Sequence, residues 1–98
     1  MLFSVRITNY QNNSMLNICD SHLLGKSISD EKITMNISKS YYCERLVEKE
    51  EAKNLLKQCS SINMVGEETV SLSIDIGIAS RSGVKEINGI PFLLIFKM

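Results

Sequence analysis

The sequence of 98 residues lacks net charge, because 11 lysines and arginines balance 11 aspartates and glutamates. Such a chain has no general electrostatic attraction for nucleic acid or acidic membranes. Long hydrophobic runs are also missing. The longest apolar stretch, residues 90–96, contains Pro91 and is shorter than the roughly 18 residues needed to span a bilayer. Arg6 and Asn9 interrupt the N-terminal residues, which argues against a secretory leader.

Cysteine and histidine are scarce. The three cysteines, Cys19, Cys43 and Cys59, form no C-x-x-C pair, and His22 is the single histidine. An odd, widely spaced set of cysteines is not typical of a disulfide framework. We therefore expect a reduced protein of the cytoplasm, with no membrane partner, no cofactor and no bound metal.

The chain does contain enough apolar residues to fold. Hydrophobic residues make up 44% of it and charged residues 22%, as in ordinary globular proteins and unlike disordered chains. At this length a second hydrophobic core would be too small, so we expect residues 1–98 to form a single domain.

Alternating apolar residues predict β-strands. Residues 2–10 and 15–19 are expected to pair as a hairpin across the polar turn between them. Residues 33–37 predict a third strand. At the other end, Asn88-Gly89 favours a two-residue turn between strands 84–87 and 90–97.

Short connections separate these strands. Asp20 is expected to cap one helical turn that carries His22 and ends at Gly25. Residues 60–65 form a short connection or a strand, and residues 81–83 form a turn.

One helix is clear and a second segment is ambiguous. Over 48–59, apolar residues recur at helical spacing and acidic residues gather in the first turn. Over 67–79, strict alternation favours a strand, whereas Gly66 followed by Glu67 and Glu68 is typical of a helix start.

Two short patterns could form a reactive or ligand-binding site. Cys19 and His22 have a C-x-x-H spacing that could serve a metal or a nucleophile, although a buried cysteine and an exposed histidine explain it as well. The segment after Gly66 could hold phosphate at a helix N-terminus, although Glu67 and Glu68 would repel an anion.

Residues 39–45 offer the best surface candidate. Two aromatic residues stand between two basic ones there, and aromatic faces can stack single-stranded bases while cations contact phosphates. The opposing interpretation is that one tyrosine fills the core and the other is exposed. The RNA-contacting residues predicted here are Lys39, Tyr41, Tyr42 and Arg45, with Lys26 beside them.

An ordered set of motifs resembles a family. The motifs are Cys19-Asp20, Leu23-Leu24-Gly25-Lys26, Tyr41-Tyr42, Glu50-Glu51-Ala52, Asn63-Met64-Val65-Gly66-Glu67 and Gly89-Ile90-Pro91. Together, over nearly the whole chain, they resemble the small archaeal family catalogued as domain of unknown function 424. The resemblance implies a role in RNA binding or in translation, and it implies a helix over 67–77.

This chain departs from the family pattern in two places. Cys43-Glu44 stands where the family usually has two glycines, which demands a different turn. Phe92 follows Pro91 where the family often has histidine, so no catalytic histidine is expected there.

We therefore predict an α+β fold with a mixed or antiparallel sheet, hairpins near both termini and two helices packed on it. The predicted core residues are Val5, Ile7, Leu55, Leu56, Val70, Ile74 and Leu94. The first functional hypothesis is a non-enzymatic module that binds RNA or ribosome-associated proteins. The second is a protein-interaction module, such as a homodimer through strand 90–96. The third is a small enzyme that uses Cys19 or His22.

Overall fold

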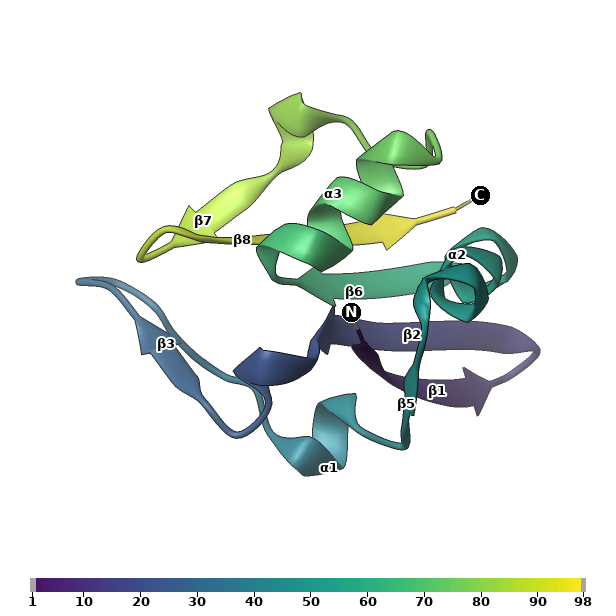
Figure 1. Ribbon diagram of the computed structural model, residues 1–98, viewed down its shortest axis with the longest axis horizontal. Helices are drawn as coiled ribbons and strands as arrows, with labels where there is room; N and C mark the ends of the chain where they lie inside the picture. Colours follow the sequence, from purple (N-terminus) through teal and green to yellow (C-terminus); the bar gives the residue numbers. More distant parts are fainter. Residues whose placement is uncertain (1, 98) are drawn as a thin grey trace.

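The computed structural model describes residues 2–97, which form a six-stranded sheet, a two-stranded sheet and three helices (Figure 1). The strands are β1 (Phe3–Tyr10), β2 (Asn13–Asp20), β3 (Ser27–Ser29), β4 (Thr34–Asn36), β5 (Arg45–Val47), β6 (Ser61–Val65), β7 (Lys85–Ile87) and β8 (Ile90–Phe96). The helices are α1 (Lys39–Tyr42), α2 (Lys49–Gln58) and α3 (Glu67–Asp75), with 3-10 turns η1 (Ser21–Leu23) and η2 (Arg81–Gly83). The predicted α+β class is confirmed.

The large sheet has the strand order β5-β1-β2-β6-β8-β7. Its neighbours are antiparallel except β2 and β6, which run parallel. Parallel neighbours need a long crossover connection, and residues 21–60 supply it with the small sheet, α1, β5 and α2. Both predicted hairpins are confirmed, and residues 61–65 form a strand.

Tight turns close both hairpins. Gln11 and Asn12 have φ angles of 49° and 69°, and Asn88 and Gly89 have 51° and 80°. Positive φ at both central residues is the requirement of a type I′ turn, whose twist matches that of the flanking strands. The Asn-Gly signal in the sequence therefore predicted its turn correctly.

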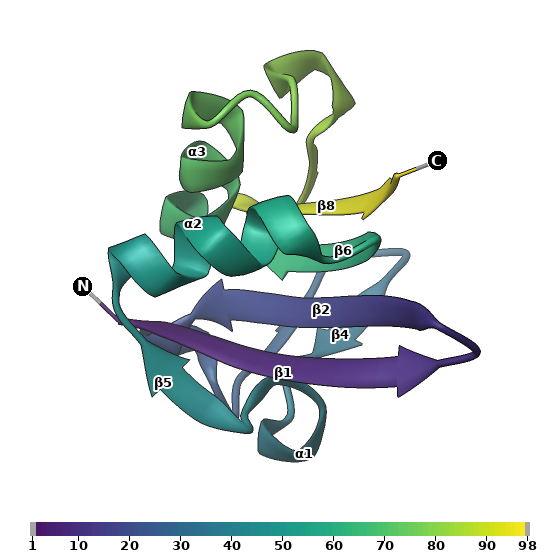
Figure 2. The same ribbon diagram turned by 90° about the vertical axis from the view of Figure 1, so that its right-hand side faces the viewer.

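Helices α2 and α3 cover one face of the large sheet, as Figure 2 shows from the side. Val5, Leu55, Leu56 and Val70 are buried in this core as predicted, and Ile7 and Ile74 pack against it while partly exposed. The predicted burial of Leu94 is wrong, because this side chain is 50% exposed.

The register of β8 explains this error. Leu93 and Ile95 pack against the helix-covered core, and side chains alternate between the two faces of a strand. Leu94 therefore points to the opposite face of the sheet, where its side chain remains exposed. An unbroken apolar run gives no indication of which positions face the core.

The opposite face of the sheet is covered only in part. The β3–β4 hairpin, η1 and α1 pack there (Figure 1). Their buried residues form a second cluster: Cys19, Leu23, Ile28, Ile37, Tyr42, Val65 and Ile87. The other half of this face stays open.

Residues 67–75 of the ambiguous segment are helical, against their own alternation, so the helix that the resemblance implied over 67–77 forms but ends two residues earlier. Residues Thr69, Val70, Leu72 and Ser73 of α3 are buried, so the helix packs closely despite its serines. Across residues 2–97, none of the helices has the length and apolar character required to cross a membrane.

Candidate functional site

Helix α1 separates the two neighbouring tyrosines. Consecutive residues in a helix point about 100° apart, so one side chain can enter the core while the next faces outward. Tyr42 is 4% exposed and Tyr41 is 62% exposed. The interpretation that one tyrosine is core and the other surface is confirmed.

Tyr42 is held from both ends. Its hydroxyl accepts a hydrogen bond from Nδ2 of Asn63 at 2.9 Å, and its carbonyl oxygen accepts one from Oγ of Ser4 at 2.7 Å. Burial raises the pKa of the Tyr42 hydroxyl above its ordinary value. The enclosed ring offers no free face for stacking, which corrects the prediction that Tyr42 contacts RNA.

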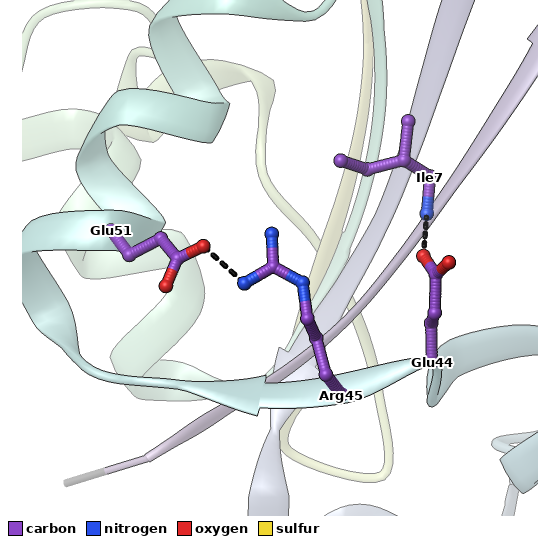
Figure 3. Close-up of polar contacts among 4 residues, drawn as sticks. All are labelled: Ile7, Glu44, Arg45 and Glu51. Carbon is purple, nitrogen blue, oxygen red and sulfur yellow. Dashed lines mark hydrogen bonds and ion pairs between the residues drawn. The ribbon is translucent and has the colours of Figure 1, made fainter.

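Arg45 lies apart from Tyr41. Its guanidinium forms an ion pair with Glu51 of α2, as Figure 3 shows. Arg45 is paired with Val5 in the sheet register, so its side chain lies on the face that α2 covers. The contacts of Tyr41 and α1 are on the other face, so the structure does not bring Arg45 into one site with Tyr41.

The side chain of Glu44 occupies a hydrogen-bonding position on the outer edge of β1. Its Oε1 accepts a hydrogen bond from the backbone N–H of Ile7 at 3.3 Å (Figure 3). This N–H lies just beyond the residues that pair with β5. A charged side chain on an open edge discourages pairing with another strand, so this edge is protected.

The predicted residues Lys26 and Lys39 are both exposed. Lys26 accepts a backbone hydrogen bond from Ile37 at 2.9 Å, which places it opposite the chain that leads into α1. Lys39 is the first residue of α1. Neither forms an ion pair with any residue that the structure describes.

A groove of about 310 Å³ lies beside Tyr41 on the open half of this face. We call it the Tyr41 groove. Its lining residues are Thr8, Asn13, Ser14, Met15, Asn17, Tyr41 and Ser61. The groove thus combines an exposed aromatic ring with a methionine and several small polar side chains.

Asn17 lies at the floor of the Tyr41 groove and is only 2% exposed. Its Nδ2 donates a hydrogen bond to the carbonyl oxygen of Tyr41 at 3.1 Å. Because that carbonyl can only accept, it determines which end of the amide faces it. Oδ1 therefore points away, and it has no hydrogen-bond partner among residues 2–97.

Arg6 is a neighbour that sequence reasoning missed. Its guanidinium donates to the carbonyl oxygen of Ser40 at 2.7 Å. Arg6 also pairs with Asn17 in the β1–β2 register, so the two side chains lie on the same face of the sheet. The signal was present in the alternation of residues 2–10, which places Arg6 on the face away from the predicted core.

Cys19 and His22 do not form a reactive pair. Cys19 is fully buried, and burial, followed by the charges of Asp20 and Cys43, raises the pKa of its thiol to about 12. The thiol therefore stays protonated at neutral pH and is a poor nucleophile. His22 is exposed on η1, and no group of three potential metal ligands occurs within the described part of the chain.

Asp20 caps α3 and not the turn that was predicted. Its carboxylate accepts hydrogen bonds from the N–H groups of Glu68 at 3.1 Å and Thr69 at 2.8 Å, and from Oγ1 of Thr69 at 2.7 Å. In η1 its side chain makes no capping bond. The carboxylate thus occupies the position that a phosphate would need at this helix N-terminus.

Several motifs that carry the family resemblance meet at the N-terminus of α3. A cavity of about 230 Å³ is lined by Asp20, His22, Leu23, Gly66, Glu67, Glu68, Gly89, Ile90 and Pro91. The N–H of Gly66 donates to the carbonyl oxygen of Pro91 at 2.8 Å. These contacts join β2, α3 and β8, so the motifs build the fold here.

Comparison with known proteins is consistent with this architecture. The family model described as "Protein of unknown function (DUF424)" matches residues 8–98. The solved structure of an uncharacterized conserved protein from Methanopyrus kandleri is similar, with a TM-score of 0.84 and 24% sequence identity. The match covers 98% of this chain and 91% of that one. The comparison with curated proteins gave no match.

Proposed function

Since this chain belongs to the DUF424 family, whose description assigns no activity, we propose a function from its own surface: the Tyr41 groove binds single-stranded RNA. The observation that carries the proposal is the exposed ring of Tyr41, which borders a groove on the open half of the sheet. Stacking of a base on an aromatic side chain contributes about 1–3 kcal/mol and tolerates any base.

Basic residues near the groove support the same proposal. Arg6 reaches the carbonyl oxygen of Ser40 beside Tyr41, and Lys39 opens the same helix. Two local cations can contact the phosphates on either side of a stacked base. With a net charge of zero, the protein has no wider attraction for RNA, so we expect weak, local binding.

Replacing Tyr41 with alanine is the direct test. We expect the affinity for short single-stranded RNA at low salt to fall by about tenfold, because the stacking surface is lost. The unfolding free energy should change by less than about 0.5 kcal/mol, since the side chain is exposed. Fluorescence anisotropy and urea unfolding measure the two quantities.

Phe96 provides a matched control. It is an aromatic residue with 64% exposure and does not line the groove. Phe96→Ala should leave RNA affinity unchanged. Undiminished RNA affinity in Tyr41→Ala, or no binding of RNA by the unmodified protein at low salt, would exclude the Tyr41 groove as an RNA site.

A second candidate function is self-association through β8. Strand β7 pairs only with residues 90–92 of β8, so residues 93–96 have a partner strand on one side alone among residues 2–97. Leu94 and Phe96 are exposed on this free half, whereas Glu44 protects the opposite edge of the sheet. An unprotected apolar edge favours strand addition.

If β8 mediates a dimer, Leu94→Lys should convert it to a monomer, because a charge on an edge strand opposes pairing. Sedimentation of both proteins at the same concentrations measures the change. A monomeric unmodified protein at the highest soluble concentration would contradict this second candidate.

A further inference from the structure

The floor of the Tyr41 groove holds a hydrogen-bond acceptor without a donor. Oδ1 of Asn17 exposes less than 1 Å² and has no partner in residues 2–97, while the Nδ2 of the same amide is bonded to Tyr41. Buried polar groups are nearly always paired, and an exception calls for an explanation. A ligand that donates at this position would provide one.

This inference rests on the proposed function: we infer that the Tyr41 groove selects bases that carry an exocyclic amino group, which cytosine, adenine and guanine have, over uracil, which has none. An amino group presents two N–H donors at the corner of the ring. It matches Oδ1 of Asn17 and also the carbonyl oxygen of Tyr41, which has a second lone pair beyond its bond to Asn17.

Uracil fits the same atoms poorly. Its single ring donor, N3–H, stands between two carbonyl oxygens. Those oxygens would face the acceptor oxygens of Asn17 and Tyr41, and neither side could donate to the other. Discrimination of this kind arises because an unpaired buried polar group retains its full desolvation penalty.

Access to Oδ1 depends on Tyr41. The Tyr41 ring is 62% exposed and lines the groove, so an outward turn would give up only its tilted contact with the Tyr42 ring, whose centroid is 6.1 Å away. A base inserted beneath the ring would then stack on it and reach Asn17. Tyr41 thus supplies a stacking surface that accepts any base, and Asn17 selects among the bases by hydrogen bonding.

Oligocytidylate and oligouridylate test this inference, because their rings are equal in size and differ at position 4 in an amino group against a carbonyl oxygen. We expect the unmodified protein to bind oligocytidylate about five- to tenfold more tightly than oligouridylate of equal length at the same salt. Asn17→Leu should abolish this preference while weak binding to both oligomers persists through stacking on Tyr41.

Asn63→Leu is the matched control. Asn63 is paired with Asn17 in the β2–β6 register and bonds to Tyr42, yet it does not line the groove. This variant should keep the preference for cytosine. Equal binding of the two oligomers by the unmodified protein, or an undiminished preference in Asn17→Leu, would overturn base selection but leave RNA binding intact. Failure of both oligomers to bind would instead reject the proposed function.

Discussion

Gly66→Ala is expected to destabilise the protein by about 3–5 kcal/mol. Gly66 has a φ of 113°, a conformation that side-chain-bearing residues rarely adopt. A Cβ atom at this position would also lie 2.4 Å from Cγ of Asp20. The carboxylate would have to move, and it would lose its hydrogen bonds to the first turn of α3.

This loss is large for a chain of this size. Domains of this kind are stable by about 5–15 kcal/mol in total, so we expect a fall in Tm of roughly 15 °C or more. Urea unfolding and thermal circular dichroism measure the change.

Gly77→Ala separates the effect of a positive φ from the effect of a clash with Asp20. Gly77 has a φ of 85°, but a Cβ there would meet nothing within 4 Å. The Gly77→Ala variant should therefore be destabilised only by the cost of placing alanine at a positive φ, about 1 kcal/mol. Equal losses at Gly66 and Gly77 would show that the contact with Asp20 contributes nothing, and would contradict the role assigned to Asp20 as the cap of α3.

Tyr42→Ala is expected to cost about 3–5 kcal/mol, the usual penalty for truncating a buried aromatic residue. The ring fills the second cluster beneath α1, and its hydroxyl bonds to Asn63. Any loss of RNA binding should follow the fraction of unfolded protein. This expectation replaces the one drawn from sequence, in which Tyr42 was a surface residue. Calorimetry together with RNA titration at several temperatures tests it.

Tyr42→Phe and Tyr41→Ala complete the comparison. The first keeps the ring and removes only the hydroxyl that accepts from Asn63, so it should cost about 0.5–1.5 kcal/mol. The second should leave stability nearly unchanged. A stable Tyr42→Ala protein with reduced RNA affinity would contradict the burial of Tyr42 and restore it as a contact.

The two tyrosines show how far sequence reasoning reaches toward the site. The pattern of adjacent aromatic residues between basic ones singled out residues 39–45, and of these Tyr41 lines the groove. Which tyrosine faces outward depends on how α1 packs against β1 and β2, through Ser4 and Asn17. Arg6 became a neighbour of Tyr41 for the same reason, although 35 positions separate them in the sequence.

The sequence by itself determined the two hairpins, helix α2 and the α+β class. Each depends on a local signal: alternation along a strand, a turn that requires positive φ, or apolar spacing along a helix. Such signals act between residues close in the chain, so a single sequence carries them in full.

Only the tertiary structure decided whether residues 67–75 form a helix or a strand, and which residues line the Tyr41 groove. The alternation there is equally suited to a strand, and the helix is capped by Asp20 from 48 positions earlier in the chain. Likewise, Asn17 and Tyr41 meet because β2 and α1 pack together. Contacts between distant segments depend on strand register and packing, which no local pattern encodes.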